Sequence, residues 1–201
     1  GDYEEAVQNY IAAMQCTSSD MKIYYQLALT YGNQGNYMQA VLTFLEALKL
    51  APNDLEIKYQ LGAAYMELNI YDTASQYFEE YVLLKIDDEI AFFLLGKCYF
   101  ESKDYPAALL AFERANQLSP DDYRTMYYIG KSYSMLGEES DAALAFRKAL
   151  KLNPEDPNTY FALGITYHKL NKKKKVLETL DILYMLDRRL YNLLRLKIQG
   201  H

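Results

Sequence analysis

Aromatic and small residues recur through this chain at a fixed interval of 34 residues. Tyrosine occupies one such position in five successive copies: Tyr31, Tyr65, Tyr99, Tyr133 and Tyr167. Phenylalanine keeps the same spacing in four: Phe44, Phe78, Phe112 and Phe146. So do alanine and glycine: Ala40, Ala74, Ala108 and Ala142, and Gly62, Gly96, Gly130 and Gly164. A strict interval of this length is typical of a repeat array, in which each unit buries its apolar face against the next.

Each 34-residue unit contains two amphipathic stretches. In residues 55–88 the apolar side chains fall three or four residues apart, which places them on one face of a helix. The two stretches meet at a short polar turn such as Lys103-Asp104, and a turn of that length joins antiparallel helices. Between units, Ser119-Pro120-Asp121-Asp122 ends one helix with proline and offers aspartate to cap the next. The pattern predicts an all-α fold of antiparallel helix pairs.

The residues at these positions resemble the tetratricopeptide repeat family. The third full unit carries the match: Leu95, Gly96, Tyr99, Ala108, Phe112, Ala115 and Pro120. The resemblance implies a right-handed superhelical solenoid of 34-residue helix pairs, forming one tetratricopeptide repeat domain over residues 1–201. We expect a partial repeat with a second helix only (1–20), then five full repeats, called repeats 1 to 5 below, and a C-terminal capping helix (191–201). The expected bounds of the full repeats are 21–54, 55–88, 89–122, 123–156 and 157–190.

Charge is distributed unevenly along the chain. Residues 1–168 carry 12 Lys and Arg against 24 Asp and Glu, a net charge of −12, whereas residues 169–201 carry 9 against 3, a net charge of +6. The acidic body disfavours general binding to nucleic acid phosphates. The basic run 172–175 is more typical of a solvated helix start than of a nuclear signal or a lipid contact.

Neither a membrane span nor a disulfide framework is expected. No stretch of 18 apolar residues occurs, so membrane insertion is not predicted. The two cysteines, Cys16 and Cys98, lie more than two repeats apart, and Cys98 falls on an apolar helical position. This usage fits a reducing compartment, and a cytoplasmic location is expected. Because the chain opens in mid-unit at Gly1, we expect it to be a piece of a longer protein.

The sequence contains no recognisable catalytic, cofactor-binding or metal-binding constellation. Its only histidines are His168 and His201, and no cysteine or histidine lies at ligand spacing. A phosphate loop and a Gly-x-Ser-x-Gly elbow are both missing. Acidic pairs such as Glu79-Glu80 are more typical of solvated helix edges than of acid–base pairs. We therefore expect no enzyme activity, no cofactor and no metal ion.

In the family that this chain resembles, the first helices line a concave groove, into which positions 2, 5, 9, 12 and 13 of each repeat point. Position 5 is aromatic in all five repeats: Tyr25, Tyr59, Phe93, Tyr127 and Phe161. Rigid amphipathic rings make good contact surface for a peptide or a helix, although the same rings can simply pack beside their neighbours. Both interpretations stay open at this point.

Basic residues at positions 9 and 2 of repeats 3 and 4 are expected to join this aromatic row: Lys97, Arg124 and Lys131. They would receive an acidic residue or the carboxyl terminus of a partner. The alternative is that Lys97 and Lys131 pair with nearby carboxylates such as Asp88.

The sequence thus predicts a non-catalytic protein–protein interaction scaffold or adaptor. Its concave groove would hold an extended or helical segment of another protein. Two alternatives remain: a bacterial secretion-type chaperone for an exported protein, and the regulatory or substrate-recruiting region of a larger enzyme. The N-terminal half unit lacks a partner helix, so self-association through that end, around Tyr3, Val7 and Tyr10, is a further expectation.

Overall fold

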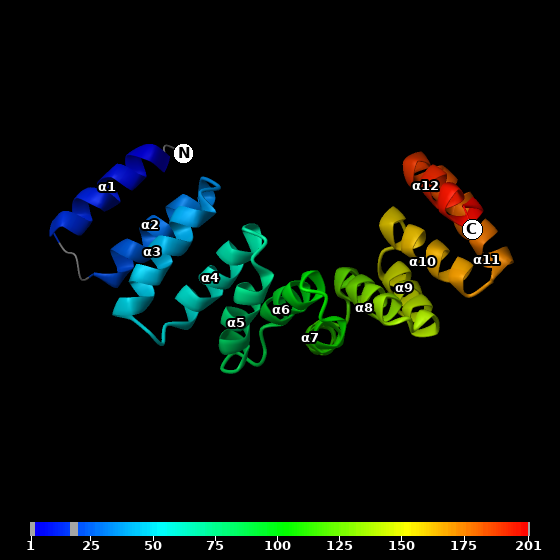
Figure 1. The fold of residues 1–201 in the computed structure, drawn as a ribbon, viewed down its shortest axis with the longest axis horizontal. Coiled ribbons are helices and arrows are strands. Elements are labelled where there is room, and N and C mark those ends of the chain that lie inside the picture. Colours follow the sequence, from blue (N-terminus) through cyan, green and yellow to red (C-terminus); the bar gives the residue numbers. More distant parts are fainter. Residues whose placement is uncertain (1–2, 17–19, 201) are drawn as a thin grey trace. The chain divides into compact units, whose positions relative to one another are not determined.

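The computed structural model describes residues 3–16 and 20–200, and all regular structure in these ranges is helical (Figure 1). The helices are α1 (Tyr3–Cys16), α2 (Met21–Asn33), α3 (Tyr37–Leu50), α4 (Leu55–Glu67), α5 (Tyr71–Val82), α6 (Glu89–Glu101), α7 (Tyr105–Leu118), α8 (Tyr123–Leu136), α9 (Glu139–Leu152), α10 (Pro157–Lys169), α11 (Lys173–Leu186) and α12 (Arg188–Gln199). No strand occurs in the described ranges, and the predicted all-α fold is confirmed.

The chain divides into two compact units. The first, Gly1–Ser102, contains α1 to α6, and the second, Lys103–His201, contains α7 to α12. Within each unit a helix contacts the next one along the chain, as α2 contacts α3 and α8 contacts α9. None of the helices in the described part of the chain combines the length and the apolar character that crossing a bilayer requires.

The turn inside each helix pair places one residue in the left-handed backbone region, always at position 15 of its repeat. The five residues and their φ angles are Gly35 (79°), Asn69 (58°), Lys103 (67°), Gly137 (81°) and Asn171 (56°). Glycine adopts this conformation without a Cβ penalty, and asparagine tolerates it better than most residues. The polar turns seen in the sequence therefore have a backbone reason.

Aspartate caps the first helix of every repeat, again at intervals of 34 residues. The side chains of five aspartates each accept a hydrogen bond from a backbone N–H in the first turn of the following helix: Asp20, Asp54, Asp88, Asp122 and Asp156. Such a cap satisfies one of the N–H groups that the first helical turn leaves unpaired. These contacts fix where each repeat begins.

Asp88→Ala is expected to lower the free energy of unfolding by about 2 kcal/mol. The Asp88 carboxylate accepts from the Ala91 N–H at 2.9 Å and from the Tyr81 hydroxyl at 2.9 Å, so its removal leaves two donors unpaired. Urea titration followed by circular dichroism measures the change. The neighbouring Asp87 is exposed, and Asp87→Ala is the matched control with an expected change within about 0.5 kcal/mol. Equal effects of the two substitutions would contradict the capping role.

Glycine at position 8 lets the second helix of the same repeat approach closely. A Cβ on Gly62 would lie 3.0 Å from the Phe78 ring, and one on Gly130 would lie 2.7 Å from the Phe146 ring. Both phenylalanines are buried, so the missing side chain is what gives each ring its place. Glycine and phenylalanine therefore recur at the same interval in the sequence because they pack against each other within a repeat.

The last repeat is packed differently, because α12 supplies the apolar side chain beneath its glycine. A Cβ on Gly164 would lie 2.5 Å from Leu194 of α12, and Leu194 is fully buried in the core of the second unit. The Asp187 carboxylate accepts from the Arg189 and Leu190 N–H groups, so α12 begins at Arg188, three residues before the expected start at 191.

Candidate functional site

In the first unit, two aromatic residues at position 5 lie on first helices and pack by their edges against buried rings. Tyr25 of α2 meets Phe44 with ring centroids 5.8 Å apart and an interplanar angle of 62°. Tyr59 of α4 meets Phe78 at 5.6 Å and 81°. Both tyrosines remain half-buried, and so does Phe93 of α6. The row therefore helps to pack the repeats and also keeps part of each ring accessible.

The hydroxyl groups of these tyrosines stay protonated over the whole neutral range. Burial, followed by the charge of Glu56 and a hydrogen bond to it, raises the pKa of Tyr25 to about 12. The Tyr25 hydroxyl donates to Glu56 Oε1 at 3.3 Å. Burial, together with Asp88 and Glu56, also raises the pKa of Tyr59. Both phenols are therefore neutral hydrogen-bond donors, and the proton of Tyr25 is already given to the Glu56 carboxylate.

A hollow of about 280 Å³ lies between α2 and α4, with α3 beneath it. Small residues create it, because Gly32 and Ala63 stand at positions 12 and 9, where a longer side chain would fill the space. Leu29 supplies apolar wall, and Gln60, Asn33 and Glu67 supply polar groups. Leu29 follows Tyr25 by one helical turn, and Gln60 is adjacent to Tyr59. We call this surface of α2 and α4, with Tyr25, Tyr59 and the hollow, the first-helix face.

Sequence reasoning singled out the tyrosines of this face but not its hollow. The signal that could have found it is a pair of small residues at inward positions of consecutive first helices, Gly32 and Ala63. An aromatic residue can be recognised in the sequence by itself, whereas a hollow depends on the absence of long side chains from two neighbouring helices.

In the second unit, Lys131 lies over two tyrosine rings of its own helix. Its Nζ atom is 5.7 Å from the ring centroid of Tyr127 and 5.1 Å from that of Tyr128. Such cation–π contacts hold the ammonium group on α8 beside the aromatic position 5. Tyr127 also packs against the buried ring of Phe146 at 5.9 Å, and Phe161 of α10 packs against the same core.

The other two basic residues of the expected cluster are placed differently. Arg124 begins α8, and its Nε donates to the Oδ1 of Asp122, the residue that caps this helix, at 2.9 Å. Burial alone would raise the pKa of Asp122, but hydrogen bonds from Arg124 and Thr125 lower that pKa below its usual value. Lys97 is a half-buried residue of α6 and belongs to the first unit. The structure thus groups Arg124, Tyr127 and Lys131 on α8.

Other reactive groups offer no further site within the described residues. Cys98 is fully buried, and that burial raises the pKa of its thiol to about 12, which keeps it from acting as a nucleophile at neutral pH. The side chain of Cys16 lies outside the described residues. No group of three or more His, Cys, Asp or Glu side chains within the described ranges is arranged to hold a metal ion.

Family models for tetratricopeptide repeats match most of the chain. One matches residues 22–54, another 55–85, another 90–122, and a further repeat model matches 1–35 and 136–171. The chain belongs to the tetratricopeptide repeat family. No curated protein sequence matches it.

Solved tetratricopeptide repeat structures share this fold over most of their length. Residues 41 to the end of MamA from Desulfovibrio magneticus RS-1 are 25% identical, with a TM-score of 0.80, over 84% of this chain and 96% of that one. Another MamA structure is 22% identical, with a TM-score of 0.77, over 81% of this chain and 95% of that one. YrrB, described as a protein of this family with an unusual peptide-binding site, is 21% identical, with a TM-score of 0.78, over 90% and 95% of the two chains.

Proposed function

We propose that this tetratricopeptide repeat protein is a non-catalytic interaction scaffold or adaptor whose first helices bind an extended or helical segment of another protein. The observation that supports this most strongly is the hollow between α2 and α4, the two helices that also carry the half-buried rings of Tyr25 and Tyr59. Aromatic rings next to a small, partly apolar hollow provide the anchor points on which peptide recognition depends. The peptide-binding site named for YrrB agrees with such a role for this fold.

The chemistry of the first-helix face suggests how a bound segment would be held. One aliphatic side chain of the partner would enter the hollow against Leu29 and Ala63. The amide groups of Asn33 and Gln60 would hydrogen-bond with its backbone, and the protonated phenol of Tyr59 would donate to one of its carbonyl oxygens. A bound backbone needs such partners because burying it unpaired would cost free energy.

The other residues of the aromatic row and the basic residues would contribute to binding within their own units. Phe93 and Lys97 would contribute from α6, Arg124, Tyr127 and Lys131 from α8, and Phe161 from α10. Because Lys131 is already held over two tyrosine rings, an acidic residue or a carboxyl terminus of the partner would meet a positioned ammonium group. A secretion-type chaperone, or a region of a larger enzyme, would use the same face, so the bound segment itself separates these alternatives.

Ala63→Trp is expected to weaken peptide binding at least tenfold, about 1.4 kcal/mol, because the indole fills the hollow. The probe is a set of peptides selected from a random library on the unmodified chain, and fluorescence anisotropy measures their affinity. Gln76→Trp is the matched control, because Gln76 is an exposed residue of the second helix α5. Circular dichroism checks that both variants keep their helix content.

The control variant is expected to bind as the unmodified chain does. Peptides that bind the Ala63→Trp variant with full affinity, or that lose affinity only for Gln76→Trp, would contradict the assignment of the first-helix face.

A further inference from the structure

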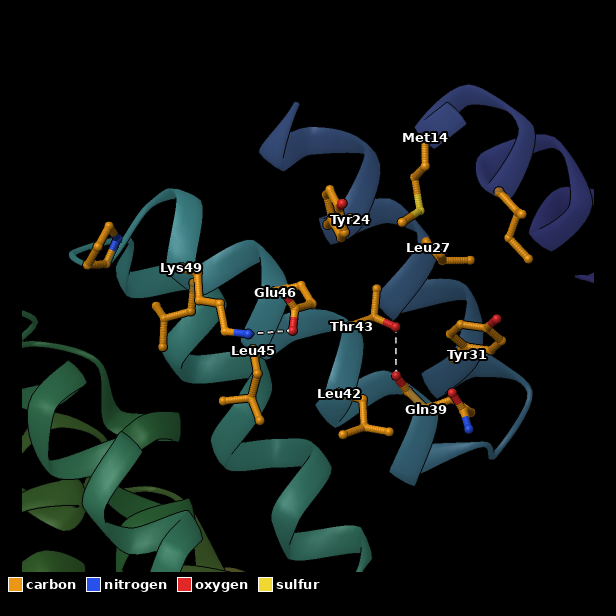
Figure 2. Close-up of a pocket in the computed structure, with 13 residues that line it drawn as sticks. Met14, Tyr24, Leu27, Tyr31, Gln39, Leu42, Thr43, Leu45, Glu46 and Lys49 are labelled. Carbon is orange, nitrogen blue, oxygen red and sulfur yellow. Dashed lines mark hydrogen bonds and ion pairs between the residues drawn. The ribbon is translucent and has the colours of Figure 1, made fainter. Parts of the chain in front are cut away.

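A second and larger hollow lies at the N-terminal end of the first unit, on the side where α1 and α3 face each other (Figure 2). Its volume is about 800 Å³, and its walls are mostly apolar: Ile11, Met14, Leu27, Leu42, Leu45 and Leu48. Figure 2 shows Met14 pointing from α1 toward Leu27 of α2. It is separate from the first-helix face, because α2 offers Tyr24, Leu27 and Tyr31 here but Leu29, Gly32 and Asn33 there.

Repeat 1 has a short side chain in this hollow where repeat 2 has an aromatic one. In repeat 2 the ring of Tyr77 stacks on Tyr65, with centroids 5.7 Å apart and an interplanar angle of 8°. The residue 34 positions before Tyr77 is Thr43, whose hydroxyl turns back to donate to the Gln39 carbonyl at 2.8 Å. Tyr31, which corresponds to Tyr65, therefore has no stacked ring and lines the hollow instead.

An ion pair that crosses the same place in repeat 2 has no counterpart in repeat 1. Lys58 Nζ reaches Glu80 Oε2 at 2.6 Å and so joins α4 to α5. The corresponding residues in repeat 1 are Tyr24 and Glu46, and Glu46 pairs instead with Lys49 of its own helix at 2.6 Å.

The corresponding hollow in repeat 4 is smaller and more polar than the one in repeat 1. It has a volume of about 200 Å³, and its lining includes the charged residues Glu113, Asp141 and Lys148. A large hollow with leucine, isoleucine and methionine walls is expected where apolar side chains of a partner are to be received.

At the C-terminal end of the chain, α12 exposes two leucine side chains of a size that would fit this hollow. On α12, Leu194 faces the core, whereas Leu193 and Leu196 are 42% and 67% exposed. These two leucines stand three residues apart, so they lie one above the other on the outward surface of the helix. Helix α12 contains no acidic residue, and basic residues flank the two leucines: Arg188, Arg189, Arg195 and Lys197.

The two ends also have opposite charge. Residues 1–21, which include α1, carry four acidic residues and no basic one, whereas α12 carries four basic residues and no acidic one. Complementary charge of this kind attracts the two surfaces and disfavours contact between two identical ends.

We propose that a second copy of this chain inserts Leu193 and Leu196 of its α12 into the hollow between α1 and α3, so that copies associate head to tail. The contact is heterologous, with different surfaces on the two partners, so a pair of copies keeps one free hollow on one copy and one free α12 on the other. Such contacts build rings if the rotation closes and open filaments if it does not. This assembly does not depend on peptide binding by the first-helix face.

Sedimentation velocity of the 201-residue chain tests the proposal, at concentrations up to about 0.5 mM because an interface below ~1,200 Å² is weak. The chain is expected to form oligomers larger than dimers as concentration rises, and added salt is expected to reduce them. A chain that stays monomeric over this range at low salt would overturn the proposal.

Two variants each block one side of the contact. Thr43→Tyr narrows the hollow with a ring that repeat 2 already accommodates at the corresponding position, so its fold is expected to be kept. The double substitution Leu193→Glu with Leu196→Glu places charge on the outward surface of α12 and spares the buried Leu194. Each variant alone is expected to be monomeric, whereas Leu144→Glu, an exposed leucine of α9, is the matched control and should associate as the unmodified chain does.

Mixing the two blocked variants distinguishes head-to-tail contact from every symmetric one. The Thr43→Tyr chain keeps a working α12 and the double variant keeps a working hollow, so the mixture is expected to form one-to-one dimers and nothing larger. Either variant dimerising alone, a mixture that stays monomeric, or a mixture that forms long oligomers would contradict the proposal.

Discussion

Phe112→Ala is expected to lower the free energy of unfolding by about 3–5 kcal/mol, the range for truncating a buried aromatic side chain. The Phe112 side chain is 0% exposed, and its ring stacks on Tyr128 with centroids 5.2 Å apart. Alanine would remove the ring and leave a cavity between α7 and α8, two helices that contact each other in the second unit. Denaturant titration followed by circular dichroism measures the loss.

Leu110→Ala is the control for this prediction, because Leu110 lies two residues earlier on the same helix and is 69% exposed. Its expected effect is within about 0.5 kcal/mol. A loss below about 1 kcal/mol for Phe112→Ala would mean that the Phe112 ring does not lie in the core.

Leu194→Ala is expected to cost about 2–5 kcal/mol, because Leu194 joins the final helix to the rest of the second unit. Its side chain is 0% exposed and occupies the space beside Gly164, where the earlier repeats have a phenylalanine from their own second helix. Helix α12 contacts both α10 and α11, so the truncation should loosen the last helix pair as well.

Leu196→Ala is the matched control on the same helix, and its expected effect is within about 0.5 kcal/mol because the side chain is outward. Hydrogen exchange of α12 amides in both variants provides the measurement. Equal protection in the two would show that α12 is not held by Leu194.

The fold could be predicted from the sequence because each local device recurs at the same interval. A turn residue with positive φ at Asn69, a cap at Asp88 and a ring at Phe78 each recur 34 residues away in sequence and in structure. Agreement between propensity, capping and packing at each position leaves little room for another fold. The start of α12 was less well predicted, because Asp187 caps it three residues before the interval would place a cap.

The candidate site was predictable only in part. Sequence spacing placed Tyr25 and Tyr59 on first helices, but their edge contacts with buried rings depend on how two helices approach. The pairing of Arg124 with Asp122 was missed, since it joins a groove candidate to a helix cap two residues away. The sequence placed Lys131 beside the aromatic row, and the structure brings its ammonium group over the rings of Tyr127 and Tyr128.

Hollows were the feature least accessible to sequence reasoning. Thr43 lines the space between α1 and α3 at a position where repeat 2 has a stacking ring, and the small residues Ala63 and Gly32 line the space between α2 and α4. The size of a hollow depends on the side chains of several helices together, so it can be predicted only once the distances between those helices are known.

The proposal that the first helices bind a peptide is tested most directly by methyl resonances of the alanine-labelled chain in NMR spectra. Peptides selected from a random library on the unmodified chain are titrated into it. The account predicts the largest shift for the Ala63 methyl group, which lies in the hollow between α2 and α4, and little change at Ala145, which lines the hollow of repeat 4. Large shifts at Ala145 with none at Ala63 would contradict it.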